Sequence, residues 1–276
     1  MKKSKDGKRI DRQIKNGRIQ NGNSRLFISH LPTDEQMKDL IAETGCGVES
    51  IEFSMASSLD RLPESICAYE KRLEFMGNPE CIFHGPFLDL NPMAFDSMVL
   101  EATRVRYEQC YQAAKALGVK QITYHTCYLP RIYMLIGWAD RVVDFYNRFL
   151  EGKEGIRILM ENVQDPEIDP ILEVADRITH PDFGLCLDTG HAHCYSNYPA
   201  DEWARRLGSH VKHIHIHDND GTFDSHLALG EGTVPTENAL TTVYANTPDA
   251  TCTIECSYEE SVRKSVEWLE HAVILP

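Results

Sequence analysis

The sequence lacks several features that would place it in other classes of protein. No apolar run approaches the roughly 20 residues needed to span a membrane, and no apolar segment follows the charged N-terminus. We therefore expect neither a membrane protein nor a secretory signal. The nine cysteines are an odd number and include no Cys-x-x-Cys pair, which favours reduced thiols in a cytoplasmic protein over a disulfide framework.

Positive charge is scarce beyond the N-terminus. The formal net charge is −14, yet residues 1–25 hold nine Lys/Arg against two Asp/Glu, which leaves −21 for the rest of the chain. A domain with this much negative charge does not attract nucleic acid through its overall electrostatic potential. Bound metal ions can nevertheless reverse the sign of the charge locally. We predict that residues 1–24 are a basic, flexible extension and that residues 25–276 form one domain.

The sequence does contain a regular alternation of short apolar segments and amphipathic helical patterns. The segments with strand character are 26–30, 49–54, 81–84, 121–125, 156–161, 183–188, 211–217 and 251–255. Eight strand–helix alternations in about 250 residues predict a parallel sheet and favour a closed (β/α)8 TIM barrel. A doubly wound open sheet is the alternative, but no glycine-rich phosphate turn follows the first strand.

The segment 213–232, HIHIHDNDGTFDSHLALGEG, is unusually rich in imidazoles and carboxylates. Its first three histidines alternate with isoleucines, as in a strand with two different faces, and a turn-rich loop with Asp224-x-His226 follows. Neutral imidazoles and deprotonated carboxylates are the ligands that a divalent metal needs. A polar loop with one or two hydrogen-bonded histidines is the alternative interpretation.

Six successive strands, from the third to the eighth, carry such residues at or just after their C-terminal ends, which form the active-site face of a TIM barrel. The nine residues are His84, His125, Glu161, Asp188, His191, His215, Asp224, His226 and Glu255. If Glu161 points into the barrel, Ile158 and Met160 point towards the helices. Nine ligands exceed the needs of one four-coordinate ion, and their mixture favours Zn²⁺ or Mn²⁺ over Mg²⁺ or Ca²⁺.

These motifs resemble the xylose isomerase-like TIM barrels, the superfamily that joins sugar isomerases and epimerases to endonuclease IV. The likeness runs from about Leu26 to the C-terminus. It rests on HGPF at 84–87, ENV at 161–163, GLCLDTGHAH at 184–193, HIHDND at 215–220, DSHLALGEG at 224–232 and IEC at 254–256. The blocks at 184–193 and 224–232 are the specific ones.

The sugar isomerase and epimerase branch is the first interpretation. There the resemblance implies one metal ion on Glu161, Asp188, His215 and Glu255. The ion would polarise a ketose or its phosphate, and Glu161 and Glu255 would move a proton through an enediolate while His191 orients a hydroxyl. The net negative charge of the domain is compatible with a small polar carbohydrate as substrate, with or without a phosphate.

The endonuclease IV branch is the second interpretation, and it implies three zinc ions on all nine residues, which cleave abasic-site DNA. The chain departs from that branch, because Gly190 replaces a cysteine and residues 217–220 lack a lysine. A third interpretation is a metal-binding barrel without turnover. The presence of both Glu161 and Glu255 argues against it.

Four further residues are predicted to contact the substrate. Phe87 stands where endonuclease IV has a tyrosine, and His30 and Glu52 lie at the ends of the first two predicted strands. His217 is expected at the rim of the pocket. For His217, a residue at the rim that supports its neighbours is the alternative. The sequence leaves the identity of the substrate and the oligomeric state open.

Overall fold

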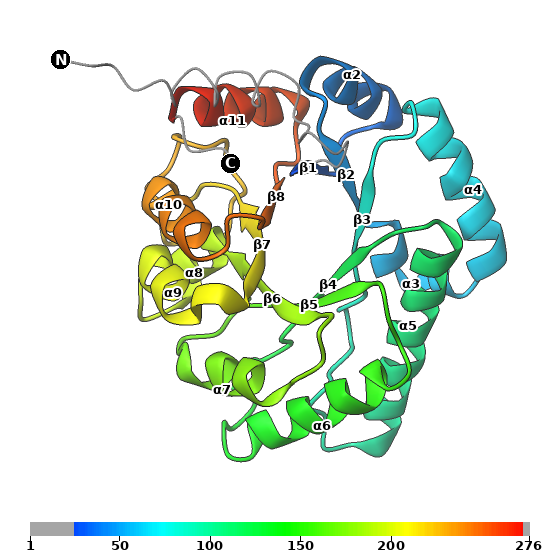
Figure 1. Cartoon of the computed structure of the whole chain (residues 1–276), viewed down its shortest axis with the longest axis vertical. Helices are drawn as coiled ribbons and strands as arrows, with labels where there is room; N and C mark the ends of the chain where they lie inside the picture. The colour runs from blue at the N-terminus through cyan, green and yellow to red at the C-terminus, as the bar shows by residue number, and fades with distance from the viewer. Residues whose placement is uncertain (1–24, 273–276) are drawn as a thin grey trace.

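Eight parallel strands close into a barrel in the order in which they occur in the chain (Figure 1). They are β1 (Leu26–Ser29), β2 (Gly47–Ser50), β3 (Cys81–His84), β4 (Gln121–His125), β5 (Arg157–Glu161), β6 (Phe183–Asp188), β7 (Val211–Ile216) and β8 (Thr251–Ile254). This computed structural model describes residues 25–272, so the predicted extension 1–24 lies outside the described residues. The closed barrel confirms the predicted TIM fold.

Helices surround the strands and connect one strand to the next (Figure 1). They are α2 (Asp34–Thr44), α3 (Ala56–Leu59), α4 (Leu62–Phe75), α5 (Ser97–Ala116), α6 (Trp138–Leu150), α7 (Asp169–Arg177), α8 (Thr189–Tyr195), α9 (Ala200–Leu207), α10 (Thr236–Asn246) and α11 (Glu259–Ala272), with 3₁₀ turns η1 (Glu52–Ser54) and η2 (Gly208–His210). A capping box of Thr33 and Gln36 begins α2, and Gly45, at φ 72°, ends it.

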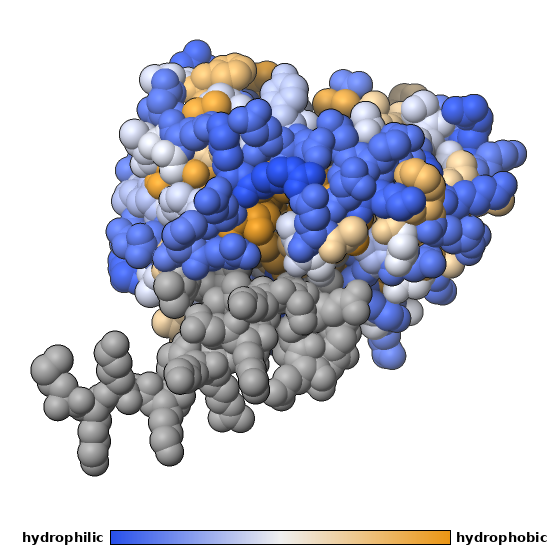
Figure 2. Space-filling view, turned by 90° about the horizontal axis from the view of Figure 1, so that it is seen from above, coloured by the Kyte–Doolittle hydropathy of each residue, from blue (hydrophilic) through white to orange (hydrophobic). Residues whose placement is uncertain are grey.

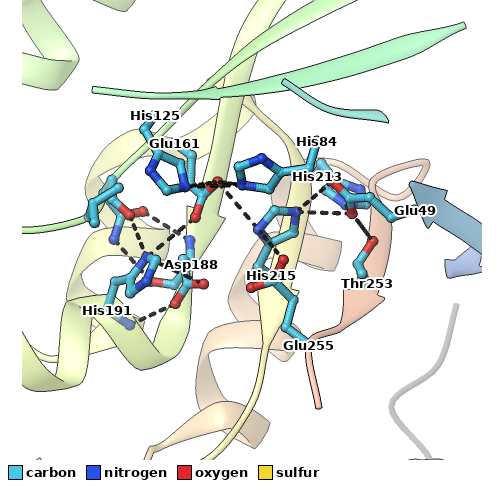
Figure 3. Close-up of polar contacts among 12 residues, drawn as sticks. Glu49, His84, His125, Glu161, Asp188, His191, His213, His215, Thr253 and Glu255 are labelled. Atoms are coloured by element: carbon cyan, nitrogen blue, oxygen red, sulfur yellow. Dashed lines mark hydrogen bonds and ion pairs between the residues drawn. The ribbon is translucent and has the colours of Figure 1, made fainter. Parts of the chain in front are cut away.

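The strands place alternate side chains on the two sides of the barrel wall. The apolar core between strands and helices includes Ile158 and Met160 of β5 and Ile214 of β7. Glu161 and His215, from the same two strands, point towards one another inside the barrel (Figure 3). The predicted alternation of polar inward and apolar outward residues is therefore present in these strands.

The second strand differs from its predicted bounds. It begins at Gly47 and ends at Ser50, and residues 52–54 form the 3₁₀ turn η1 instead of continuing the strand. Gly47 permits a close approach to β1, because a Cβ atom there would lie 2.5 Å from the ring of Phe27. Because β2 spans residues 47–50, Glu49 lies within the strand and faces the barrel interior, whereas Glu52 lies beyond its end.

The face of the barrel shown in Figure 2 is mostly hydrophilic, with apolar residues in separate patches. Its helices follow the usual amphipathic pattern: α11, for example, buries Val262, Ser265 and Leu269. Within residues 25–272, no helix combines the length and the apolar character that crossing a membrane requires.

Candidate metal centre

The nine predicted ligand residues meet at the C-terminal ends of six adjacent strands, and Figure 3 shows most of them. Together with His217 they lie in three adjoining clusters. We call these the first flanking cluster (His84, His125, Glu161), the central cluster (Glu161, Asp188, His215, Glu255) and the second flanking cluster (His191, His217, Asp224, His226). Glu161 belongs to the first two, and its Oε1 lies 3.3 Å from Nδ1 of His191 in the third, so the clusters form one continuous polar centre.

The central cluster is built around His215. Its Nδ1 lies 3.4 Å from Oε2 of Glu161 and 3.3 Å from Oε1 of Glu255. Asp188 is beside it, because the two residues are register partners in β6 and β7. On the far side of the ring, Nε2 lies 3.1 Å from Oε2 of Glu49. A carboxylate at Nε2 fixes the ring so that Nδ1 is available to a metal.

The backbone fixes the tautomer of three other histidines. Nδ1 of His84, His191 and His226 is in each case the donor to a carbonyl oxygen. The acceptors are Gly85, Asn162 and Glu255, at 2.9, 3.0 and 2.7 Å. This arrangement leaves Nε2 of all three rings as an electron-pair donor, the state in which histidine binds a metal.

In the first flanking cluster, Nε2 of His84 lies 3.0 Å from Nε2 of His125. Each of these nitrogens is 3.6 Å from Oε2 of Glu161. Two nitrogen lone pairs at this distance repel unless a proton or a cation lies between them. The partly buried ring of Phe87 stacks on His125 with 4.2 Å between ring centroids, so this predicted substrate contact borders the metal centre.

The second flanking cluster is organised by Asp224. Its Oδ2 lies 3.2 Å from Nε2 of His191 and 3.4 Å from Nε2 of His226. Its Oδ1 lies 3.6 Å from Nε2 of His217. His217 was expected at the rim of the pocket, but its side chain is fully buried among these groups.

Several buried atoms of the centre have no hydrogen-bond partner. They are both carboxylate oxygens of Glu161, Oδ2 of Asp188, Oδ1 of Asp224 and Nδ1 of His215. Buried carboxylate oxygens without donors or cations are strongly unfavourable. A divalent cation supplies the missing positive charge, and a mixed imidazole and carboxylate set suits Zn²⁺ or Mn²⁺. The residues present therefore fit the metal that the sequence predicts.

The surrounding charges separate the pKa values of the two central glutamates. Burial raises the pKa of Glu255 above its ordinary value, and His215 offsets only part of that effect. Burial also acts to raise the pKa of Glu161, but His215 and His125 outweigh it and hold that pKa well below the ordinary range. Two carboxyl groups beside one imidazole thus differ in their readiness to hold a proton.

Comparison with known proteins places the chain in a family. A family model described as xylose isomerase-like TIM barrel matches residues 39–272. The chain belongs to this family. An uncharacterized protein of Methanocaldococcus jannaschii, MJ1311, is 30% identical over 173 residues. That alignment covers 56% of this chain and 57% of MJ1311, so the chain spans little more than half of that relative.

Two solved structures share the fold of this xylose isomerase-like barrel. A D-tagatose 3-epimerase-like protein is 23% identical, with a TM-score of 0.70 over 91% of this chain and 98% of its own. The TTHB071 protein from Thermus thermophilus, soaked with ZnCl2, is 21% identical, with a TM-score of 0.71 over 90% of this chain and 97% of its own. At these identities the likeness establishes the shared architecture.

The C-terminal end of β6 fixes the positions of several residues of the metal centre. Asp188 ends β6 and caps α8, since its Oδ1 accepts the backbone N–H of His191 at 2.6 Å. Asn162 exchanges two hydrogen bonds with the backbone of Asp188, at 2.9 and 3.0 Å. Nδ1 of His191 bonds the backbone of Asn162 and its Nε2 faces Asp224, so both its predicted roles, metal ligand and residue that orients a hydroxyl, stay predictions.

Two of the predicted substrate contacts lie in a separate ion network. Oε2 of Glu52 accepts a hydrogen bond from Nη1 of Arg72 at 2.7 Å. The ring nitrogens of His30 lie 2.9 Å from the hydroxyl of Tyr69 and 3.0 Å from Oδ1 of Asp34. Both nitrogens of His30 therefore have protein partners, and a substrate role for either residue stays a prediction.

Sequence reasoning missed Glu49. This fully buried carboxylate accepts a hydrogen bond from the hydroxyl of Thr253 and lies 3.4 Å from Nε2 of His213, besides its contact with His215. Burial acts to raise its pKa, but His215 and His213 outweigh that effect and hold the pKa well below the ordinary value. The signal in the sequence is an acidic residue inside an apolar segment that would otherwise make an ordinary strand.

Proposed function

We propose that the chain is a divalent-metal-dependent enzyme that moves a proton on a carbon atom of a small carbohydrate, as sugar isomerases and epimerases do. The observation that carries this proposal is the pair Glu161 and Glu255, which lie 3.4 and 3.3 Å from the same nitrogen of His215. Two carboxylates placed on the same bound substrate can serve as base and acid in proton transfer at carbon.

The central cluster would hold one ion through Glu161, Asp188, His215 and Glu255. When bound, this ion polarises the carbonyl and the adjacent hydroxyl of a ketose. Glu161, which is kept ionised, accepts the proton from the carbon beside the carbonyl group. Glu255, which lies 3.3 Å from Nδ1 of His215, would return a proton. Return to the opposite face of the same carbon epimerises the sugar, and return to the neighbouring carbon isomerises it.

The character of the chain supports a small, polar substrate. A net charge of −14 repels a polyanion and so disfavours its binding, whereas it does not affect the binding of an uncharged sugar. The partly buried ring of Phe87 borders the centre and offers an apolar surface for the C–H face of a sugar. The shared fold with a D-tagatose 3-epimerase-like protein agrees with this substrate class. Substrates with and without a phosphate belong in the test.

The experiment incubates protein loaded with Zn²⁺ or Mn²⁺ with a panel of ketoses and ketose phosphates, and chromatography detects new epimers or aldoses. Glu255→Gln is expected to lower turnover at least about 100-fold while most of the metal stays bound. The control is Glu260→Gln, at an exposed glutamate of α11. Undiminished turnover in Glu255→Gln, or no change in any sugar of the panel, would contradict the proposal.

A second candidate, phosphodiester hydrolysis by three zinc ions, is favoured by one observation. All nine predicted ligands come together, and Glu161 joins the first flanking cluster to the central one. Adjoining ions of this kind can bind a phosphate and activate a hydroxide. Its test is incision of a duplex that carries an abasic site. Cleavage by the metal-loaded protein, without turnover of any sugar, would replace the first proposal with this one.

A further inference from the structure

Two neighbouring loops at the C-terminal end of the barrel expose many apolar side chains. They are the loop between β3 and α5, with the first turn of that helix, and the loop between β4 and α6. Elsewhere in residues 25–272, only Phe223 and Tyr258 are large apolar residues that are more than half exposed. Six such residues lie on the two loops, and we call them the apolar loop surface: Leu88, Phe95, Met98, Ile132, Met134 and Ile136.

Arg141 of α6 holds the two loops side by side. Its guanidinium group lies over the ring of Phe95, 4.1 Å from the ring centroid. Its Nε donates a hydrogen bond to the carbonyl oxygen of Met93 at 3.0 Å, and its Nη1 donates one to that of Ile136 at 3.4 Å. The two loops therefore contribute to one surface.

The area of the apolar loop surface is that of a protein interface. Side chains of this size expose on the order of 150–200 Å² each when nothing covers them, so the six exposed fractions amount to roughly 650–850 Å². The largest apolar patch of a typical monomer is about 300–600 Å², and a standard interface buries about 800 Å² on each partner. Side chains this exposed do not line a pocket for a small ligand, so the surface fits a macromolecule.

The charges around this surface favour a second copy of the chain as the partner. Residues 88–104 and 129–148 hold four arginines and five Asp/Glu, a balance of −1, so the rest of residues 26–276 carries −20. Four of the nine charges lie in ion pairs, Glu101–Arg104 at 2.5 Å and Asp144–Arg148 at 2.9 Å. Two copies with a net charge of −14 repel one another, but the repulsion is small where these nearly neutral segments meet.

The same face has a hollow beside the exposed side chains. It has a volume of about 340 Å³, lies between α5 and α6, and is lined in part by Leu100, Arg141 and Phe145. Phe95 and Ile136 border it, because Arg141 contacts both of them. A two-fold interface joins one patch to its own copy, so the patch must offer both protruding and recessed parts. The exposed loops and the hollow provide the two.

We propose that the apolar loop surface is the interface of a two-fold symmetric homodimer. The two loops directly follow β3 and β4, which end at His84 and His125 of the first flanking cluster. The partner therefore packs on the loops that follow two of the predicted metal ligands. A lipid surface is the other macroscopic partner for exposed apolar loops, but the net negative charge of the chain opposes binding to anionic membranes.

Sedimentation equilibrium at about 1–100 μM protein measures the mass and the dissociation constant of the dimer. Ile136→Asp places like charges on both sides of a two-fold interface, and it leaves the core intact because the side chain of Ile136 is 82% exposed. The control is Tyr258→Asp, at a 75% exposed residue that follows β8, on the opposite side of the barrel from β4.

The wild type and the control are expected to sediment with twice the mass of one chain, and Ile136→Asp to dissociate at least about 100-fold more readily. A wild type that is monomeric at about 100 μM, or equal dissociation constants in wild type and Ile136→Asp, would overturn the proposal. A monomer that sediments with phosphatidylcholine vesicles would overturn it in favour of a lipid surface. No metal or sugar enters these measurements, so they are independent of the proposed reaction.

If Ile136→Asp does not fold, hydrogen exchange of the wild-type protein decides. Backbone amides of residues 131–136 are expected to exchange more slowly in concentrated than in dilute solution, because the partner covers them only in the dimer. A rate of exchange in this loop that does not change with protein concentration, while the mass doubles, would overturn the proposal.

Discussion

Replacement of Glu49 tests whether a carboxylate behind His215 controls the metal centre. Glu49 is fully buried, and its Oε2 lies 3.1 Å from Nε2 of His215. The change Glu49→Gln keeps the size of the side chain and an acceptor for the ring, but it removes the negative charge. His215 then becomes a weaker electron-pair donor at Nδ1, the nitrogen that faces Glu161 and Glu255.

The expected size of this effect follows from the position of Glu49 outside the ligand set. Partners of metal-bound histidines typically change metal affinity by about 10- to 100-fold. This range corresponds to about 1.4–2.7 kcal/mol of binding free energy. Equilibrium competition with a chelator measures it at the central cluster, and Glu70→Gln, at an exposed residue of α4, is the control. An affinity within about twofold of the wild type, or an equal loss in the control, would refute the reasoning.

Two further changes test the stability of the fold instead of metal binding. Burial raises the pKa of Asp165 to about 6, so its contribution to stability is present at low pH and is lost as pH rises through 6. Asp165→Asn should therefore gain about 2 kcal/mol relative to the wild type between pH 4 and pH 8 in urea unfolding, and parallel curves would contradict this. Thr33→Ala removes the hydroxyl that accepts the N–H of Gln36 and should lower the free energy of unfolding by about 1 kcal/mol; an unchanged urea midpoint would contradict the capping role.

The fold and most of the candidate ligands could be predicted from the sequence, because both depend on local patterns. A polar residue at the end of an apolar strand, such as Glu161 or Asp188, has no place in the core and lies at the mouth of a barrel. Eight such segments in one chain leave few other architectures. The predicted alternation succeeds because a strand has a period of two, whatever surrounds it.

The remaining features depend on contacts between distant segments. Glu49 acquires its role only when β2 lies opposite His213 and Thr253 across the barrel interior. The predicted second strand began too late in the sequence, because the close approach of Gly47 to Phe27 is a tertiary contact. His217 has the same spacing as a strand residue, yet β7 ends before it and its ring turns into a space left by Gly190.

The central claim is that Glu161, Asp188, His215 and Glu255 hold a divalent ion at the mouth of the barrel. Anomalous diffraction at the zinc and manganese edges tests it most directly, with crystals of protein purified without chelators. We expect a peak about 2.0–2.2 Å from Nδ1 of His215 and from the carboxylate oxygens of the other three residues. A fully metal-loaded protein with no peak among these four residues would contradict it.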